Sequence, residues 1–289
     1  RKRVRTVFHD LKAELNPQIM ATIGKVDQIV HLAAGSHVDR SIDFPMEFVL
    51  DNVVGTANIL EFARRCENLD RFIYFSTDEV FGPAPEGVKY KENDRYNSTN
   101  PYSASKAGGE ELVVAYENTY KLPCYISHTM NVFGERQHPE KFIPKCIISA
   151  RDGLPVEIHS NKKKTKAGSR HYIHASDVAD GCLFLIKNRN RILNKNNHDY
   201  GGAKCPKFNL VGPVELDNLE LAKLIAVSVG KKLKYKMVDF HSSRPGHDLR
   251  YALDGTLMKR LGWKPKVSIE KRIDQVVNWT LKNKRWLKI

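Results

Sequence analysis

The sequence predicts an α/β protein in which a doubly wound parallel sheet carries a second, smaller α/β lobe. Short apolar runs that are typical of buried strands alternate with longer segments of helical periodicity. At 289 residues the chain is longer than one average domain and can bury a sizeable core. Its apolar content is 41%, and no apolar run reaches the ~18 residues that would cross a membrane.

The elements follow one another in the order expected of such a sheet. The strands are short and rich in β-branched and aromatic residues, and the helices carry apolar residues at helical spacing. The predicted strands are Val4–Phe8, Gln28–Leu32, Phe72–Phe75, Cys124–Thr129 and Phe208–Val211. The predicted helices are Leu11–Ile23, Pro45–Cys66, Pro101–Tyr120, Val178–Ile186, Leu219–Val229 and Ile269–Asn283. Because strand and helix alternate, we expect the strands to be parallel.

The cysteines and histidines indicate neither a disulfide framework nor a metal site. The five cysteines are widely spaced and form no C-x-x-C pair, so we expect reduced thiols and a cytoplasmic protein. The eleven histidines show no H-E-x-x-H or similar spacing, so we expect no metal. The first residues have no signal-peptide pattern, because the basic start runs directly into a strand-like stretch.

The net charge of +14 indicates an anionic partner. Nucleic acid and a nucleotide pyrophosphate both fit this charge. The densest basic cluster, Lys162–Lys166, contains no aromatic residue on which bases could stack. We therefore interpret this cluster as a solvated loop, and we do not expect nucleic acid to be the partner.

The Pro101–Tyr120 helix carries a tyrosine and a lysine four residues apart, Tyr102 and Lys106. Positions i and i+4 share one face of a helix, so both side chains can enter one pocket. An ammonium beside a phenol favours the phenolate and lowers its pKa. This spacing predicts that Tyr102 acts as a base on a hydroxyl group near neutral pH.

A second polar group follows the predicted strand that ends at Phe75. Here Thr77, Asp78 and Glu79 come directly after a buried apolar run. Ligands of open α/β sheets bind at the carboxyl ends of the strands. Two neighbouring carboxylates near an activated tyrosine are therefore interpreted as an acid and a base with separate roles.

Together these motifs resemble the dTDP-glucose 4,6-dehydratases among the extended short-chain dehydrogenase/reductases. The resemblance rests on S-T-D-E-V (76–80), N-P-Y-x-x-x-K (100–106), A-A-x-S-H-V-D-R-S (33–41), N-x-F-G (131–134), P-E-K-x-I-P (139–144) and R-P-G-H-D-x-R-Y (244–251). It runs from about Val26 to the carboxyl terminus. Five motifs in the family order, besides the one with the tyrosine–lysine pair, make it specific.

The resemblance implies an NAD-dependent dehydratase that converts a nucleotide-bound hexose into a 4-keto-6-deoxy sugar. Tyr102 would take the C4 hydroxyl proton, with Thr77 bonded to that hydroxyl and Lys106 holding the nicotinamide ribose. Glu79 would remove the C5 proton, and Asp78 would protonate the leaving C6 hydroxyl. The implied cofactor-binding residues are Asp10, Ala33, Ala34, Ser36, Ser76, Tyr102 and Lys106. The implied substrate-binding residues are Ser36, His37, Arg40, Asn131, Lys141, Arg170, Asn209, Arg244 and His247.

The family also implies a division of the chain and a homodimer. A Rossmann-type NAD-binding domain would comprise residues 1–133 and 171–211, and a smaller nucleotide-sugar-binding lobe residues 134–170 and 212–289. The helices at 45–66 and 101–120 would pair across a two-fold axis. The sequence contains no glycine-rich dinucleotide turn, so we expect it to begin near the family's third strand and to bind NAD weakly as given. The choice between NAD and NADP stays open, because the ribose-binding carboxylate is absent.

The substrate and several rival activities stay open as well. dTDP-glucose, UDP-glucose and UDP-N-acetylglucosamine are all candidates, and C5 epimerisation could follow. A 4-epimerase would share Tyr102 and Lys106 but needs no Asp78–Glu79 pair. A nucleotide-glucuronate decarboxylase would require a cationic site that the sequence does not reveal. The missing glycine motif favours a non-catalytic nucleotide-sugar-binding protein, which the intact catalytic residues oppose.

Overall fold

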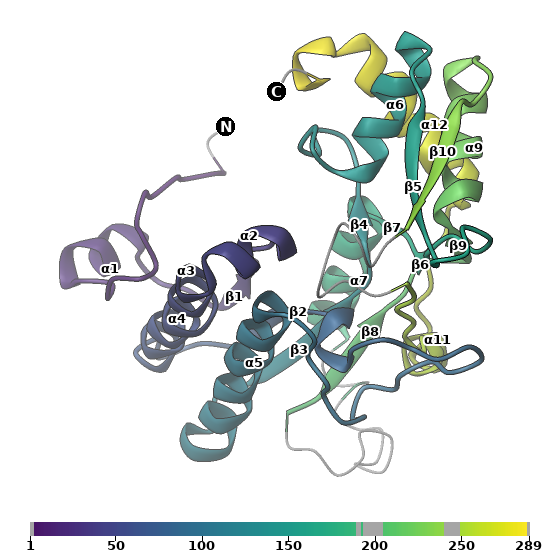
Figure 1. Cartoon of the computed structure of the whole chain (residues 1–289). Coiled ribbons are helices and arrows are strands. Elements are labelled where there is room, and N and C mark those ends of the chain that lie inside the picture. Colours follow the sequence, from purple (N-terminus) through teal and green to yellow (C-terminus); the bar gives the residue numbers. More distant parts are fainter. Residues whose placement is uncertain (1–2, 189–191, 193–204, 240–248, 288–289) are drawn as a thin grey trace. The chain divides into compact units, whose positions relative to one another are not determined.

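The computed structural model describes residues 3–188, 192, 205–239 and 249–287, and the chain divides into two compact units (Figure 1). The first unit contains residues 1–82, 92–128 and 195–208. The second contains residues 83–91, 129–194 and 209–289. The chain therefore crosses between the units several times.

The first unit is built on a four-stranded sheet in the order β1-β2-β3-β8. These strands are β1 (Gln28–His31), β2 (Arg71–Thr77), β3 (Cys124–Thr129) and β8 (Lys207–Leu210). β1 and β2 pair in parallel, with Gln28 opposite Arg71 and His31 opposite Tyr74. β2 and β3 are almost entirely buried, as expected of parallel strands that are covered on both faces. The predicted parallel α/β class is confirmed.

The predicted helix at 45–66 is a continuous helix that is interrupted by a π-helical turn in its middle. It consists of α3 (Pro45–Val49), a π-helical turn, η1 (Leu50–Val54), and α4 (Gly55–Arg64). The π turn carries the buried Asn52, whose amide bonds the backbone of Gly35 and the hydroxyl of Ser105. The irregular turn thus joins the loop after β1 to the helix that carries Tyr102.

That helix, α5 (Pro101–Tyr120), has the predicted bounds because both of its ends are specified locally. Asn100 caps the amino end in a reciprocal capping box with Ser103, and Pro101 takes the first helical position. At the carboxyl end, Lys121 adopts a left-handed conformation, which ends the helix.

Two glycines in α5 provide a matched test of its packing. A Cβ at Gly109 would lie 2.5 Å from the Tyr74 hydroxyl and 2.6 Å from the Asn52 carbonyl, whereas one at Gly108 would meet only Val53, at 3.2 Å. We expect Gly109→Ala to reduce the free energy of unfolding by about 1–3 kcal/mol, as overpacking does. Gly108→Ala should change it by less than about 1 kcal/mol. Urea unfolding of both variants measures the difference, and equal effects would contradict this account.

The second unit has its own apolar core, which includes Phe133, Ile147, Ile158, Ile225 and Ile273. Its helices are α6 (Phe142–Asp152), α7 (Ala175–Lys187), α9 (Asn218–Val229), α11 (Thr256–Leu261) and α12 (Ile269–Lys282). Parallel pairs join β5 (Val156–Ser160) to β10 (Tyr235–Asp239) and β4 (Val132–Phe133) to β7 (Ile173–His174), and β6 (Ser169–His171) pairs antiparallel with β9 (Glu215–Asp217).

Several sequence-based predictions of elements are wrong or incomplete. Val4–Phe8 forms no strand, and its apolar side chains Val4 and Phe8 are exposed, because an apolar extended run becomes a strand only beside a partner. The helix predicted at 11–23 shortens to α1 (Pro17–Ile23), since Asn16 caps it and Pro17 starts it. The short strands of the second unit were not predicted, because runs of two to five residues carry little periodicity.

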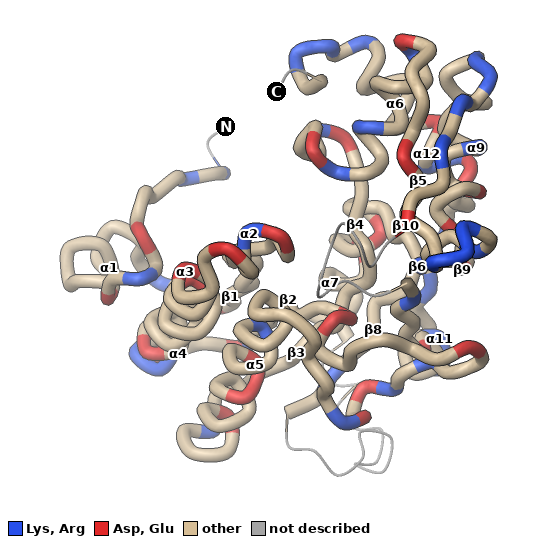
Figure 2. Tube along the Cα trace, viewed as in Figure 1, with Lys and Arg blue, Asp and Glu red and all other residues tan. Residues whose placement is uncertain are grey.

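The basic cluster Lys162–Lys166 lies in an exposed turn, as the sequence predicts. Figure 2 shows Lys and Arg distributed over both units, with a dense stretch in the turn between β5 and β6 that corresponds to Lys162–Lys166. The lysines of this turn are exposed, and Lys166 pairs with Glu86 at 2.9 Å. Among the described residues, no helix has both the length and the apolar character required to cross a membrane.

Candidate active site

The carboxyl end of β2 places three of the predicted catalytic residues in the first unit. β2 runs into a short 3-10 turn, η2 (Asp78–Phe81), which Thr77 caps. The Thr77 hydroxyl accepts a hydrogen bond from the Glu79 amide at 3.3 Å and donates one to the Asp78 carboxylate at 3.0 Å. Thr77 and Asp78 are buried and Glu79 is half-buried, so the hydroxyl fixes the Asp78 carboxyl group and the Glu79 backbone relative to the strand.

The start of α5 provides the other side of this group. The Asn100 amide, which caps the helix, donates a hydrogen bond to the Glu79 carboxylate at 3.2 Å. The Tyr102 backbone amide donates to the Ser41 hydroxyl at 3.1 Å, and the Tyr102 ring makes an edge contact with Phe48. A hydrogen bond also links the Tyr102 phenol to Thr77. The predicted residues of β2 and α5 are therefore brought together.

The electrostatics of Tyr102 differ from the sequence-based prediction. Burial raises the pKa of Tyr102 well above its usual value, and the neighbouring Glu79 carboxylate raises it further, while the nearby Thr77 hydroxyl opposes the shift. The prediction that Lys106 lowers this pKa is wrong for the structure. The physical reason is the position of Lys106, whose ammonium lies 4.2 Å from the centre of the Tyr74 ring.

Lys106 is itself strongly perturbed. Its side chain is buried, and burial lowers the pKa of the ammonium to about 7 from a usual 10.5. The folded state therefore binds fewer protons than the unfolded state between these two values. Consequently the stability of the protein rises with pH from about 7 to about 10.5, and the charged lysine is a cost below that range.

Lys106→Met is expected to stabilise the protein at pH 6 by at least about 1.4 kcal/mol, which corresponds to one pKa unit. Methionine keeps most of the side-chain volume and removes the buried charge. Thermal unfolding at pH 6 and pH 9 measures the effect, which should shrink at the higher pH. The control is Lys145→Met, at an exposed position. A Lys106→Met protein that is less stable than the wild type at pH 6 would contradict the prediction.

The residues predicted to bind the cofactor differ in solvent exposure. Ala33, Ala34 and Ser36 are exposed in the loop that follows β1. Ser76 lies in β2, and its buried hydroxyl has no hydrogen-bond partner within the described part of the chain. Asp10 is exposed, and its carboxylate accepts a hydrogen bond from the Lys12 amide at 3.0 Å.

Two predicted substrate residues of the first unit have structural partners. The His37 ring caps α2 (Val38–Asp43) by accepting a hydrogen bond from the Arg40 amide at 3.3 Å. The Arg40 guanidinium lies 3.5 Å from the Glu47 carboxylate. Both residues come within ten residues of the carboxyl end of β1 in the chain.

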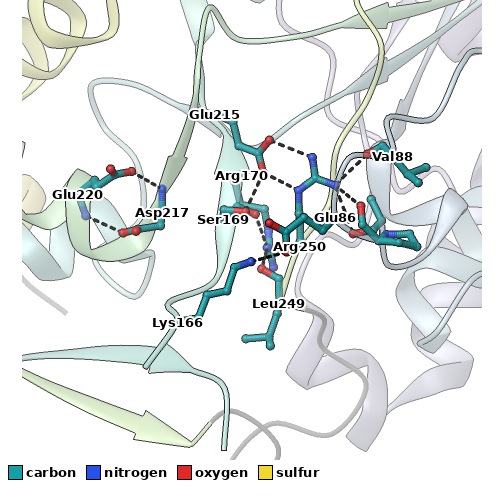
Figure 3. Close-up of polar contacts among 12 residues, drawn as sticks. Glu86, Val88, Lys166, Ser169, Arg170, Glu215, Asp217, Glu220, Leu249 and Arg250 are labelled. Atoms are coloured by element: carbon teal, nitrogen blue, oxygen red, sulfur yellow. Dashed lines mark hydrogen bonds and ion pairs between the residues drawn. The ribbon is translucent and has the colours of Figure 1, made fainter. Parts of the chain in front are cut away.

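The remaining predicted substrate residues belong to the second unit. Arg170 lies in β6, donates to the carbonyl groups of Ser169 and Leu249 at 2.7 Å, and stacks on the Tyr251 ring at 4.6 Å (Figure 3). Asn131 is exposed, and Lys141 precedes α6 beside Glu140. Asn209 is fully buried and donates to the carbonyl groups of Tyr90 and Asp254. Arg244 and His247 lie outside the described residues.

Three asparagines that the sequence analysis missed contact these groups. Asn100 could have been found, because an asparagine before proline is a typical helix cap. Asn52 gives no local signal, since its role depends on the π turn. Asn218 starts α9, where its backbone amide donates to Gly168 and its side chain accepts a hydrogen bond from Tyr172. Only the β6–β9 pairing brings Asn218 close to Arg170.

Comparisons with known proteins show the family to which the chain belongs. Residues 1–276 match the family described as GDP-mannose 4,6 dehydratase. The low-salt glycan biosynthesis protein Agl12 of Haloferax volcanii is 39% identical over 259 residues, covering 90% of this chain and 77% of that protein. The dTDP-glucose 4,6-dehydratase of Salmonella typhimurium is 34% identical over 284 residues, covering 90% and 74%.

A solved structure extends the similarity to three dimensions. The structure is that of DesIV, a dTDP-glucose 4,6-dehydratase from Streptomyces venezuelae with NAD and TYD bound. It superposes with a TM-score of 0.80 at 31% identity, and the match covers 97% of this chain and 80% of that one. With the fold, the motifs and the family match over residues 1–276 in agreement, the chain belongs to the GDP-mannose 4,6 dehydratase family.

Proposed function

We propose that this protein is an NAD-dependent nucleotide-hexose 4,6-dehydratase that yields a 4-keto-6-deoxy sugar. The observation that carries the proposal is the group at the end of β2. Thr77 contacts both Asp78 and Tyr102, while Asn100 holds Glu79. A 4-epimerase requires the tyrosine and lysine but has no use for two further carboxyl groups, so this group favours the dehydratase.

The residues around β2 and α5 fit a dinucleotide. Ser76 offers a buried hydroxyl without a partner among the described residues. Lys106, four residues after Tyr102 on the same helix, offers a buried ammonium. These side chains, with the exposed loop at Ala33, Ala34 and Ser36, would hold the cofactor. When bound, NAD supplies the oxidant for C4, the reductant for C6 and a positive ring that favours the phenolate.

The protein side chains then handle three protons. Tyr102 accepts the proton of the C4 hydroxyl, and Thr77 orients that hydroxyl. The C4 ketone acidifies the C5 proton, which Glu79 removes; the Asn100 amide favours its carboxylate form by donating to it. Asp78 gives a proton to the departing C6 hydroxyl. Asp78 is the more deeply buried of the two, and its carboxyl group contacts the Thr77 hydroxyl.

In the second unit we assign the nucleotide diphosphate to Arg170, Lys141 and Asn131, because guanidinium and ammonium groups bind phosphate well. Arg244 and His247 belong to the same proposal, on the sequence motif alone. Asn209 is not assigned to the diphosphate, because its amide group already donates hydrogen bonds to two backbone carbonyl groups.

We also infer a cytoplasmic homodimer. The five free cysteines suit a reducing compartment. The exposed Met46 and Leu50 on the helix at 45–64 suit a contact between copies. Sedimentation velocity with and without Leu50→Glu tests the dimer.

The activity is tested by offering nucleotide sugars to the protein in the presence of NAD. dTDP-glucose, UDP-glucose, UDP-N-acetylglucosamine and GDP-mannose are supplied separately, and mass spectrometry follows the loss of one water. One donor is expected to be dehydrated, which would also identify the substrate. Isomerisation without loss of water would instead favour an epimerase, and binding without reaction would favour a non-catalytic protein.

Two variants separate the roles of the carboxyl groups when the reaction is run in D₂O. Glu79→Gln is expected to abolish both water loss and deuterium uptake at C5, because the base is absent. Asp78→Asn is expected to abolish water loss but to retain deuterium uptake at C5. Mass spectrometry of the recovered sugar measures both. The same exchange behaviour in the two variants would contradict the assigned roles.

A further inference from the structure

The second unit contains a cavity of about 440 Å³ that the proposed reaction does not use. This volume lies within the range of small-ligand sites. The cavity is lined by Lys89, His171, Asn209, Val211, Gly212, Pro213, Leu253, Asp254, Gly255, Thr256, Met258, Lys259, Trp263, Lys264 and Pro265. None of these residues belongs to the group at the end of β2 or to the residues assigned above to the diphosphate.

The walls of the cavity combine positive charge with an apolar surface. Lys89, Lys259 and Lys264 line it, against a single carboxylate, Asp254. Apolar side chains complete the wall, among them the largely buried ring of Trp263, whose indole N–H donates to Asp180 at 2.9 Å. An anionic ligand with a flat apolar portion matches both features.

His171 adds a buried polar atom to this cavity. Its side chain is 4% exposed, and its Nδ1 has no hydrogen-bond partner in the part of the chain that the structure describes. Burial, together with the nearby positive charge of Lys89, lowers the pKa of His171 to about 4, while Glu215 opposes the shift. The ring is therefore neutral at physiological pH, and Nδ1 is available to a ligand. A buried polar atom without a partner is costly in a site that stays empty.

Arg250 holds in place the segment that ends at Val88, next to Lys89 in the chain (Figure 3). Its guanidinium makes two hydrogen bonds to Glu215, at 2.7 and 3.0 Å, and further bonds to the carbonyl groups of Pro85 and Val88, at 2.6 and 2.8 Å. Backbone bonds from Tyr90 to Ala252 and from Asp254 to Tyr90 continue the contact. The lysine therefore comes from an anchored segment, which reduces the entropy cost of binding.

We propose that this cavity binds a phosphorylated small molecule, with the phosphate between Lys89, Lys259 and Lys264 and an apolar ring beside Trp263 and Met258. The site is separate from that of the nucleotide sugar, and the proposal does not depend on the reaction assigned above. His171 would bond a polar group of the ligand inside the cavity. A nucleoside monophosphate and simpler aryl phosphates share this chemistry.

The proposal is tested by calorimetric titration of the full chain with phenyl phosphate, and in separate runs with inorganic phosphate and with UMP. Phenyl phosphate is expected to bind one site, at least tenfold more tightly than inorganic phosphate, because only the former has a ring. Lys259→Glu/Lys264→Glu should weaken its binding by at least tenfold. UMP binding with the same dependence on these lysines would identify nucleotides as ligands, and UMP binding without it would locate UMP at another site.

A matched variant controls for the change in net charge. Lys231→Glu/Lys232→Glu alters the charge by the same amount at exposed positions of the second unit, and neither residue lines the cavity. It should leave phenyl phosphate binding unchanged. Equal weakening in both double variants would indicate unspecific attraction and overturn the proposal. The absence of phenyl phosphate binding, or unchanged binding in Lys259→Glu/Lys264→Glu, would overturn it as well.

Discussion

Replacing Tyr102 with phenylalanine is expected to lower the turnover number by a factor of about 10²–10⁴, the range that a positioned proton-transfer group contributes. The substitution removes one oxygen and keeps the ring, so the edge contact with Phe48 survives. The hydrogen bond to Thr77 is lost. Initial rates of water loss, measured at saturating nucleotide sugar, give the ratio.

The pH dependence gives a second readout of the same residue. Because burial and Glu79 raise the pKa of Tyr102, the phenolate is a minor form near neutral pH. The rate of the wild-type protein should therefore increase with pH above 7, and Tyr102→Phe should lose this increase. Tyr120→Phe, at the exposed end of the same helix, is the control and should behave as the wild type. A Tyr102→Phe protein that keeps more than a tenth of the wild-type rate would remove Tyr102 from the mechanism.

Glu110→Ala is expected to reduce the free energy of unfolding by about 3–5 kcal/mol, the usual cost of breaking a buried ion pair. The Glu110 carboxylate is completely buried on α5, 2.9 Å from the Lys207 ammonium and 3.1 Å from the His128 ring. Lys207 and His128 lie on β8 and β3, so this contact ties the catalytic helix to two strands of the sheet. Urea unfolding at pH 7 measures the loss.

The pH dependence of stability follows from the same contact. Burial alone would raise the pKa of Glu110, but His128 and Lys207 outweigh it and hold the value at about 2. The stabilisation is therefore complete above about 4.5, the usual value, and is lost as the pH falls towards 2. The control is Asp152→Ala, which breaks an exposed pair with Arg151 and should cost less than about 1 kcal/mol. Similar losses in the two variants would show that burial does not strengthen the contact at Glu110.

The sequence predicted those elements whose signals are local. α5 has the expected bounds because its cap, its first proline and its stop lie within its own sequence. β3 likewise matches, since its β-branched and aromatic residues are typical of a strand. Val4–Phe8 has the same character but forms no strand, because strand formation depends on a neighbour that the local sequence does not specify.

The candidate site likewise combines features that the local sequence predicts with features that depend on distant segments. Its residue types follow from spacing: a tyrosine and a lysine one turn apart, and two carboxyl groups at the end of a strand. Their electrostatics do not, because a pKa depends on burial and on distances between elements far apart in the chain. The spacing predicted a lowered pKa for Tyr102, whereas Lys106 lies against Tyr74 and Glu79 lies close to the phenol.

The sequence by itself therefore determined the fold class and the family, and it predicted the residues proposed to carry the chemistry, because periodicity, caps and motifs are properties of short stretches. Only the tertiary structure decided which of these residues contact one another and in which direction their pKa values shift. It also decided that the Asn209 amide donates hydrogen bonds to backbone carbonyl groups. It also revealed the lysine-lined cavity, whose walls come from five separate stretches of the chain, around Lys89, His171, Val211, Leu253 and Trp263. Contacts between distant segments are fixed by packing, and packing is decided by the whole chain at once.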